Sequence, residues 1–260
     1  MYMTHGTEKL PEDRSSTIWR YMDFTKFVYM LDQQALFFCR PDCLDDRFEG
    51  TWGKVSRQAL QQELKDHIAS GGRVFRDIDF QLEAHKRNAA NMRQTIAVSC
   101  WHLNPHESAA MWKLYVYAHQ GIAIRSTVSK LIESFPNDKS ILIHVGMVNY
   151  IDFDSESIPT GNYLSPMMYK RKSFEHEREL RAVACKAEIT ETDTSFSMRV
   201  LDKPFAVPGE NVAIDLSVLI ESIHLAPGSP TWMTQLITSV AKRYGLSVPV
   251  MNSKLDDDPA

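Results

Sequence analysis

Apolar and polar residues alternate along the chain with two different periods, which divides it into short helices and strands. After Asp23, a residue type that caps helices, apolar residues recur three and four positions apart and predict a helix. The apolar run at 35–39 is typical of a strand, and the run at 95–101 predicts a buried one. Near 53–69 and 78–93 the apolar stripe is narrow, which predicts two polar helices at the surface.

The clearest helix start follows the strand at 95–101. Asn104 is a capping residue, Pro105 suits the first helical position, and Glu107 completes a capping-box pattern. Gly121 is expected to end this helix before the next strand, after which Ser126 should cap another short helix.

Extended segments make up most of the rest of the chain. Further strands are expected in the apolar, often β-branched segments at 141–150, 179–186, 198–206, 222–226 and 247–251. One last helix is expected to begin at Ser229-Pro230 and to end at Gly245. Because strands and helices do not alternate regularly, the predicted fold class is α+β, a single domain with a mixed or antiparallel sheet core and peripheral helices.

Both ends of the chain are polar. Residues 1–16 carry charges without a pattern and are expected to be a flexible segment, and 253–260 form an acidic tail. Between them there is no repeat, low-complexity tract or long linker. The sequence therefore predicts one globular domain at 17–252.

Composition places the chain among ordinary globular proteins. Of its 260 residues 43% are hydrophobic and 24% charged, which excludes a disordered or fibrous chain. With 29 Lys and Arg against 33 Asp and Glu, the formal charge is -4, so there is no strong nucleic-acid signal. No apolar run approaches the roughly 18 residues of a membrane helix and no signal segment is visible, so we expect a cytoplasmic protein without membrane contact.

Cysteines and standard motifs exclude several kinds of site. The four cysteines are too few for a disulfide scaffold, and Cys39 and Cys43 have no second pair at zinc-finger distance, so we expect reduced thiols and no metal. The sequence contains no P-loop, Rossmann, nucleophile-elbow or zincin motif. The sequence therefore lacks the usual motifs of P-loop nucleotide hydrolysis, Rossmann dinucleotide binding, α/β-hydrolase chemistry and zincin proteolysis.

The densest charged cluster, at 170–181, leads into a predicted strand. On a strand, the side-chain period of two puts Glu177, Glu179 and Arg181 on one face. Two carboxylates on one face repel each other unless they share a cation or a ligand. Such a pair can orient a nucleophile, accept a hydrogen bond from a ribose hydroxyl or bind a metal, or it can belong to a structural ion pair at a strand edge.

Two other charged groups are candidates for a site. The turn-rich segment 40–50 contains Asp46 and Glu49, which can act as site carboxylates or as turn caps. Arg20 lies between two aromatic residues and either pairs structurally or binds a phosphate through its planar fork.

Aromatic residues supply the remaining candidates. Trp112, with His119 after it, lies on a predicted helix whose aromatic spacing is typical of core packing. Trp101 and His102 come at the end of a predicted strand, where functional loops often begin.

The order of these motifs resembles the bacterial family known as domain of unknown function number 2971. The resemblance covers about residues 17 to 250 and rests on six separated motifs: W-R-Y, D-D-R-F-E-G, V-S-C-W, M-W-K-L-Y with H-Q-G-I-A-I, K-R-x-x-F-x-x-E-x-E-L-R and L-A-P-G-S-P. Arg47 and Trp101 depart from the residues that are more usual in that family. The resemblance implies a family and no established activity.

A second, weaker resemblance is to ADP-ribosyltransferases of the Arg–Ser–Glu type. That family has an arginine on an early strand, a serine on a middle strand and an E-x-E at a late strand, in the order in which Arg20, Ser99 and the pair Glu177 and Glu179 occur here. The chain lacks the threonine and second serine that complete the middle motif.

That resemblance implies NAD as a substrate and a role for each residue. Glu179 would face the positive charge that develops on the ribose during glycosidic cleavage, and Glu177 would orient the acceptor. Arg20 would bind the diphosphate and Ser99 would brace the ribose region. An aromatic residue, Tyr21 or Trp101, would stack on nicotinamide.

Two alternatives remain open beside an NAD-using enzyme. A metal-dependent nuclease or phosphoesterase would use Asp46, Glu49, Glu177 and Glu179 with Mg²⁺, and the basic run at 170–172 would meet phosphates. A non-catalytic domain would use its aromatic residues to line a groove for a ligand or partner. In each case a small phosphate-bearing ligand or nucleotide is a candidate partner.

Overall fold

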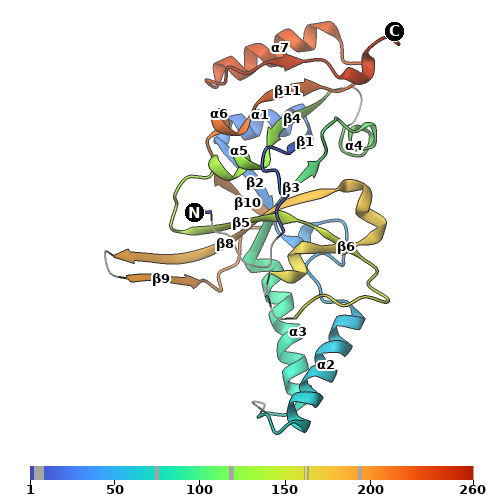
Figure 1. Cartoon of the computed structure of the whole chain (residues 1–260). Helices are drawn as coiled ribbons and strands as arrows, with labels where there is room; N and C mark the ends of the chain where they lie inside the picture. Colours follow the sequence, from blue (N-terminus) through green and yellow to red (C-terminus); the bar gives the residue numbers. More distant parts are fainter. Residues whose placement is uncertain are drawn as a thin grey trace.

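A mixed sheet of mostly antiparallel strands forms the centre of the molecule (Figure 1). The computed structural model describes residues 1–2, 9–73, 76–116, 120–160, 162, 164–192 and 195–259. The main sheet contains β1 (Thr17–Asp23), β2 (Ala35–Cys39), β3 (Ile96–Leu103), β4 (Gly121–Thr127), β5 (Ile141–Met147), β8 (Glu179–Thr192), β9 (Ser195–Val200), β10 (Gly209–Ala213), β11 (Ser222–Leu225) and β12 (Val250–Met251). A separate ribbon pairs β6 (Asn149–Ile151) with β7 (Tyr169–Arg171).

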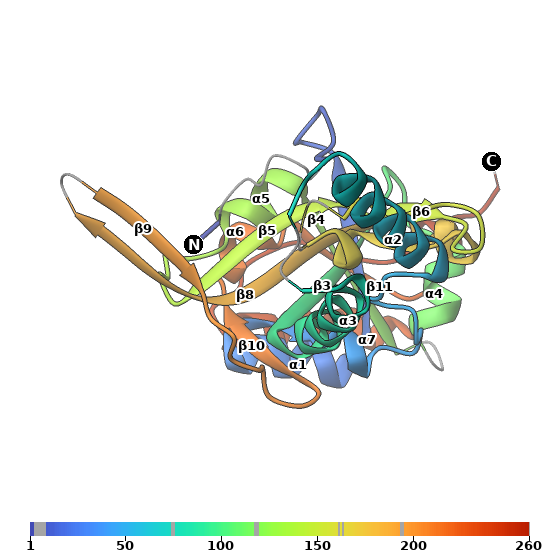
Figure 2. The same ribbon diagram turned by 90° about the horizontal axis from the view of Figure 1, so that it is seen from below.

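Helices lie around the sheet and confirm the α+β class. They are α1 (Phe24–Gln33), α2 (Lys54–Ala69), α3 (Ile78–Thr95), α4 (Ala109–Tyr115), α5 (Val128–Glu133), α6 (Leu216–Leu219) and α7 (Thr231–Arg243). Short 3-10 helices occur at η1 (Pro41–Cys43), η2 (Ser165–Met168), η3 (Lys172–Glu177) and η4 (Lys254–Asp256). The two polar helices predicted from the narrow stripes form a hairpin, α2–α3, that projects away from the sheet (Figures 1 and 2).

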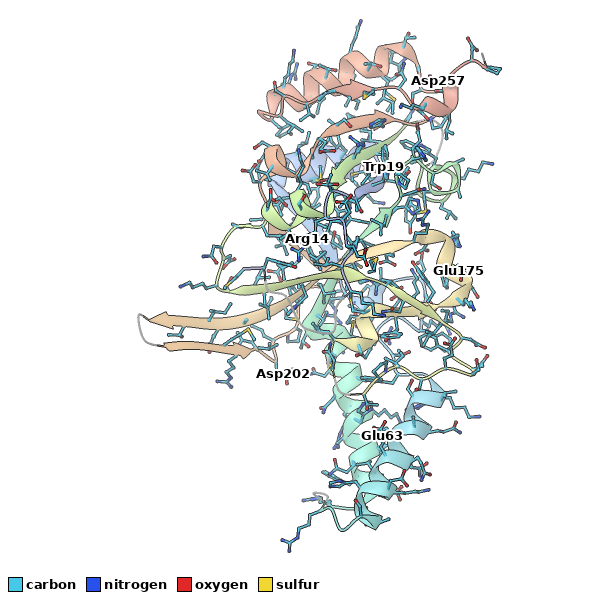
Figure 3. All side chains as sticks on the ribbon, viewed as in Figure 1. Arg14, Trp19, Glu63, Glu175, Asp202 and Asp257 are labelled. Atoms are coloured by element: carbon cyan, nitrogen blue, oxygen red, sulfur yellow. The ribbon has the colours of Figure 1, made fainter. Side chains whose placement is uncertain are left out.

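Charged side chains lie at the outside of the molecule. Glu63 lies on α2 of the hairpin and Glu175 lies on η3, and both are drawn at the outside of the molecule (Figure 3). The long β8–β9 hairpin forms a second projection, on another side of the sheet (Figures 1 and 2).

Strand β3 organises the site because it has three neighbours. β8 pairs with β3 from Ile96 to His102 and so occupies one edge of it. β2 and β1 share the other edge: β2 meets β3 only at Val98, and β1 meets it at His102 and Leu103. The main sheet therefore splits between β1 and β2, opposite the middle of β3.

The pleat of β3 and β8 separates an apolar face from a partly charged one. Ala97 and Trp101 face the largest hydrophobic core, together with Leu180 and Ala182 of β8. Residues of the opposite parity, Cys100 and His102 on β3 with Glu179 and Arg181 on β8, share the other face. This second face carries most of the polar site described below.

Several predicted element boundaries are confirmed. Asp23 caps α1, since its Oδ1 accepts a hydrogen bond from the Lys26 amide at 2.8 Å. β2 spans the five residues expected from the pattern. α7 begins directly after Pro230, and Gly245 follows it with a φ of +79°, a conformation that glycine adopts without strain.

The predicted start of α4 is wrong. The helix begins at Ala109 with Ser108 as its cap, and Asn104 and Pro105 lie in the preceding loop. Glu107 does not complete a capping box, because its carboxylate accepts hydrogen bonds from Trp112 and the C-terminal segment. Gly121 does not end the helix, which stops at Tyr115; it is the first residue of β4.

Two further expectations need correction. Thr127, and not Ser126, caps α5, because the Ser126 hydroxyl donates to the Leu219 carbonyl. Strand β10 was not predicted, and it becomes a strand by pairing with β2 along its whole length.

The terminal segments contact the domain at several points. The Met1 ammonium donates to the carbonyls of Asp138 and Ile141, at 2.7 Å each. Near the other end, Asp256 accepts hydrogen bonds from the Gly228 amide at 2.9 and 3.0 Å.

Candidate functional site

Arg20 lies in the gap where β1 and β2 separate. Its Nη2 donates to the Phe37 carbonyl of β2 at 3.1 Å, and its Nη1 donates to the Ser99 hydroxyl of β3. The guanidinium carbon lies 5.8 Å from the centre of the Trp101 ring. The structure thus brings together three candidate residues from two motifs that lie far apart in the sequence.

The charge of Arg20 has no acidic partner among the described residues. Burial lowers the pKa of Arg20, and the groups that raise it are the weak acids Cys100, Tyr115 and Cys39. A cation held in this way is stabilised when an anion binds beside it, because a guanidinium matches the geometry of phosphate and carboxylate oxygens.

A cavity of about 620 Å³ opens at this gap. Its volume lies within the usual range for small-molecule sites. Of the predicted site residues, seven line it: Arg20, Tyr21, Asp46, Glu49, Trp101, Glu177 and Glu179. The other described candidates do not: Ser99 lies behind Arg20, Arg181 lies beneath the carboxylates, and Trp112 packs in a small aromatic core.

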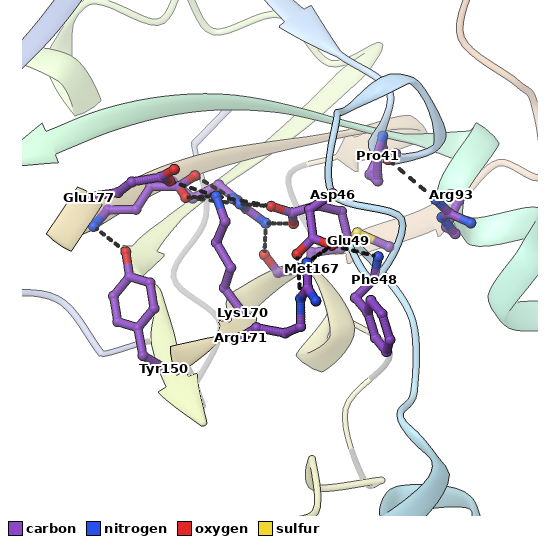
Figure 4. A network of polar contacts seen from close by, with 12 residues as sticks. Pro41, Asp46, Phe48, Glu49, Arg93, Tyr150, Met167, Lys170, Arg171 and Glu177 are labelled. Atoms are coloured by element: carbon purple, nitrogen blue, oxygen red, sulfur yellow. Dashed lines mark hydrogen bonds and ion pairs between the residues drawn. The ribbon is translucent and has the colours of Figure 1, made fainter. Parts of the chain in front are cut away.

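A network of buried charges forms one wall of the cavity (Figure 4). The Lys170 ammonium lies 2.6 Å from Glu177, 3.2 Å from Glu49 and 3.4 Å from Glu179. Arg181, which is fully buried, contacts Glu179 at 2.8 Å and Glu49 at 3.0 Å. Three carboxylates thus face two cations, which leaves the network with one excess negative charge.

The two glutamates of the E-x-E motif differ in their surroundings. Burial alone would raise the pKa of Glu179, but Arg181 and Lys170 outweigh burial and hold it at about 2. Burial raises the pKa of Glu177, and Lys170 only partly offsets this. Glu179 is therefore a firmly ionised member of a buried ion-pair network, and Glu177 is the carboxylate that protonates more readily.

Glu177 is not part of the strand, which corrects the predicted two-residue period. It is the last residue of η3, and Arg178 after it has a left-handed φ of 41°. The strand begins at Glu179, and only Glu179 and Arg181 share its face as expected. Lys170, rather than strand geometry, brings the two glutamates together.

The acidic segment 40–50 reaches the same wall. Asp46 caps its own turn by accepting from the Phe48 amide at 3.1 Å, and it also pairs with Arg171 at 2.8 Å. The Arg171 guanidinium lies over the ring of Phe48, 4.6 Å from its centre. Asp46 is thus both a turn cap and a link between two segments that lie far apart in the sequence.

Aromatic residues close the side of the cavity near α4. The Tyr21 hydroxyl accepts from the Ser108 amide at 2.8 Å, and its ring packs edge-on against Trp112. These contacts fix the start of α4, as the aromatic spacing of a core helix predicts. His119 lies outside the described residues.

Three further cavity residues, Lys170, His102 and Tyr115, were given no catalytic or NAD-binding role by the sequence, although His102 was noted at the end of a strand. Lys170 was expected to meet phosphates as part of a basic run, but it pairs with carboxylates. His102 accepts from Asn104 and donates through Nδ1 to the Glu177 carbonyl at 2.6 Å, and burial lowers its pKa. Tyr115, at the end of α4, is half exposed at the cavity. A signal for Tyr115 was present, since it belongs to the M-W-K-L-Y motif.

The acidic clusters converge as the metal-dependent alternative requires, but cations lie between them. Lys170 and Arg181 lie within ion-pair distance of Glu49 and Glu179, where a metal would otherwise compete for the same oxygens. In the part of the chain that the structure describes, no group of three or more His, Cys, Asp or Glu side chains is arranged to hold a metal ion.

Comparisons with known proteins add no relative. The chain matches no model of a known protein family, no curated protein and no solved structure. Among the described helices, none is both long and apolar enough to cross a membrane.

Proposed function

We propose that the chain is an enzyme that binds NAD in this cavity and cleaves the bond between nicotinamide and ribose, as an ADP-ribosyltransferase does. One observation carries the proposal: one cavity has on one wall an arginine that pairs with no acidic side chain in the described part of the chain, and on another a carboxylate network with excess negative charge. NAD⁺ has the matching charges, since its diphosphate is anionic and its nicotinamide ring is cationic. The resemblance to the family of unknown function and a cytoplasmic location are part of the same proposal.

The local environments lead us to exchange the roles expected for the two glutamates. Glu179 already pairs with two cations, so its charge is poorly placed to stabilise a further positive centre. Among the described residues, Glu177 has Lys170 as its one ion-pair partner, and it lines the cavity. Glu177 is therefore the carboxylate that we propose faces the ribose. Glu179 has a structural role, because it pairs with Lys170 and Arg181 in the cavity wall.

Two side chains of this chain act on NAD⁺ in the proposed reaction. Arg20 binds the diphosphate, and Glu177 stabilises the positive charge that develops at the ribose carbon as the glycosidic bond breaks. The bonding electron pair leaves with the nicotinamide nitrogen, which becomes neutral. Water or an acceptor group then bonds to the ribose carbon and releases its proton to solvent.

Release of nicotinamide from labelled NAD⁺ tests this proposal. We expect wild type to release it, and Glu177→Gln and Arg20→Met each to lower kcat/KM by at least about tenfold to a hundredfold. Glu175→Gln and Arg57→Met, at exposed positions outside the cavity, are matched controls and should behave as wild type. Absence of both hydrolysis and transfer in wild type refutes the enzyme, and binding of NAD⁺ without turnover supports the non-catalytic alternative.

A further inference from the structure

Lys170 lies at the centre of the network in Figure 4 and belongs to a different segment from each of its partners. It is the middle residue of β7, whereas Glu49 comes from the segment after η1, Glu177 from η3 and Glu179 from β8. Its side chain is only 9% exposed. A buried ammonium in contact with three carboxylates is held in place from several directions.

The β6–β7 ribbon positions Lys170 in the wall of the cavity. Tyr150 of β6 pairs with Lys170 in the parallel register, and the Tyr150 hydroxyl accepts from the Glu179 amide at 2.8 Å. The ring of Phe174 covers the ammonium, with its centre 4.9 Å from Nζ. The position of Lys170 therefore depends on backbone pairing as well as on the carboxylates.

Its three partners do not depend on it equally. Glu49 and Glu179 each keep a contact with Arg181 when Lys170 is removed. Among the described residues, Glu177 has an ion pair with Lys170 alone. Removal of this one amine should therefore disturb Glu177 far more than the other two carboxylates.

We propose that Lys170 is the positioning residue of the cavity and holds the Glu177 carboxylate at the wall that faces a bound ligand. The proposal rests on the function proposed above in so far as Glu177 contacts that ligand. A ligand hydroxyl or cation can share Glu177 with Lys170, because Lys170 keeps its contacts with Glu49 and Glu179.

Several groups from different elements act on Glu177. Burial raises its pKa first, Lys170 lowers it, and the negative charges of Glu179 and Glu49 raise it. His102 holds its backbone carbonyl, and the titratable side chains of Tyr115 and Tyr150 also lie within electrostatic reach of its carboxylate. Among these groups, Lys170 is the one that lowers the pKa of Glu177 and so opposes the effect of burial.

The experiment measures Glu177 itself. Protein with ¹³C-labelled glutamate side-chain carboxyls is titrated by NMR, and the Glu177 signal is assigned by its loss in Glu177→Gln. In Lys170→Met the titration midpoint of Glu177 should move upward by about 1 to 3 pH units, since one close opposite charge has an effect of that size. Lys170→Arg should stay near wild type, and Lys172→Met, at an exposed position of η3, is the matched control.

A charge-balanced double variant separates positioning from support of the fold. Lys170→Met with Glu49→Gln removes one cation and one anion, so the network keeps its single excess negative charge. If Lys170 only balances charge, the double variant should restore both the titration of Glu177 and ligand binding. Under our proposal, Glu177 still titrates high and the Kd for NAD⁺ is still raised by about tenfold or more.

The outcomes are distinguishable. If either folded variant lacking Lys170 shows the wild-type titration of Glu177, the positioning role is refuted. If wild type does not bind NAD⁺ at all, the proposed function fails while the NMR titration still decides the role of Lys170. If Lys170→Met does not fold, the charge-balanced variant carries the test.

Discussion

Replacement of Arg181 by methionine should show how much the buried network contributes to stability. The guanidinium has no solvent exposure and contacts Glu179, Glu49 and the Met167 carbonyl, the last at 2.6 Å. Arg181→Met keeps most of the side-chain volume but leaves two buried carboxylates with Lys170 alone. Breaking a buried pair in this way typically costs about 3 to 5 kcal/mol.

The pKa of Glu179 sets the expected pH dependence. Arg181 and Lys170 hold this pKa at about 2, well below that of an unperturbed glutamate, and the lowered pKa stabilises the folded chain. Because the folded pKa is lowered, this stabilisation is complete above about pH 5 and is lost as the pH falls toward 2. The gap between wild type and Arg181→Met should therefore be largest near pH 7 and should narrow from pH 5 downward.

Urea unfolding followed by circular dichroism at pH 7, 5, 4 and 3 measures this gap. Arg125→Met is the matched control, since Arg125 also pairs with a glutamate at 3.0 Å, but its side chain is 39% exposed. Exposed pairs contribute about 0 to 1 kcal/mol, so the control should lose no more than that. A gap for Arg181→Met below about 1 kcal/mol at pH 7, or one that stays constant down to pH 3, contradicts the reasoning.

Three other predictions concern separate parts of the chain. Arg20→Met should weaken binding of NAD⁺ by about tenfold to a hundredfold but leave binding of nicotinamide riboside, which lacks phosphate, unchanged, as calorimetry can measure. Asp23→Ala removes the cap of α1 and should lower the free energy of unfolding by about 1 kcal/mol in urea; an unchanged value would show that the cap is replaced by water. Tyr115→Ala should leave stability within about 0.5 kcal/mol, because the side chain is 47% exposed, while it weakens NAD⁺ binding; equal affinity would place the ligand away from α4.

Hydrophobic periodicity predicted the parts of the fold whose burial is regular. The stripe after Asp23, the apolar run at 35–39 and the two narrow stripes of the helical hairpin each correspond to one observed element. Local signals failed where a distant residue competes for the same groups. Glu107 matches a capping box, but the C-terminal segment and the Trp112 indole take its carboxylate oxygens, so the helix begins after it.

Strand β10 illustrates another limit of sequence patterns. Its residues Gly209–Ala213 contain one strongly apolar side chain that is buried, Val212, and no alternation that predicts a strand. The segment is extended because each residue pairs with β2, a contact about 170 positions away in the sequence. Such pairing depends on topology, which local patterns do not contain.

The candidate site was predictable in its residue types but not in its connections. The segments at 40–50 and 170–181 were each selected for charge, yet nothing local indicates that Asp46 pairs with Arg171 or that Glu49 pairs with Arg181. The two-residue period also placed Glu177 on the strand, whereas it is the last residue of η3. The strand begins only after Arg178, whose left-handed backbone the sequence pattern does not predict.

These connections separate two roles within one charged motif. Arg181 is buried behind the cavity wall and pairs with Glu179 in that wall, so the loss of either residue should reduce stability whether or not a ligand is present. Arg20 lies at the cavity and pairs with no acidic side chain among the residues that the structure describes, and Glu177 keeps a raised pKa, so the surrounding side chains only partly stabilise the charge of either group. Groups left in this state are the ones that gain most from a ligand of complementary charge. The measurement of stability and ligand binding in both kinds of variant therefore tests the site and its scaffold independently.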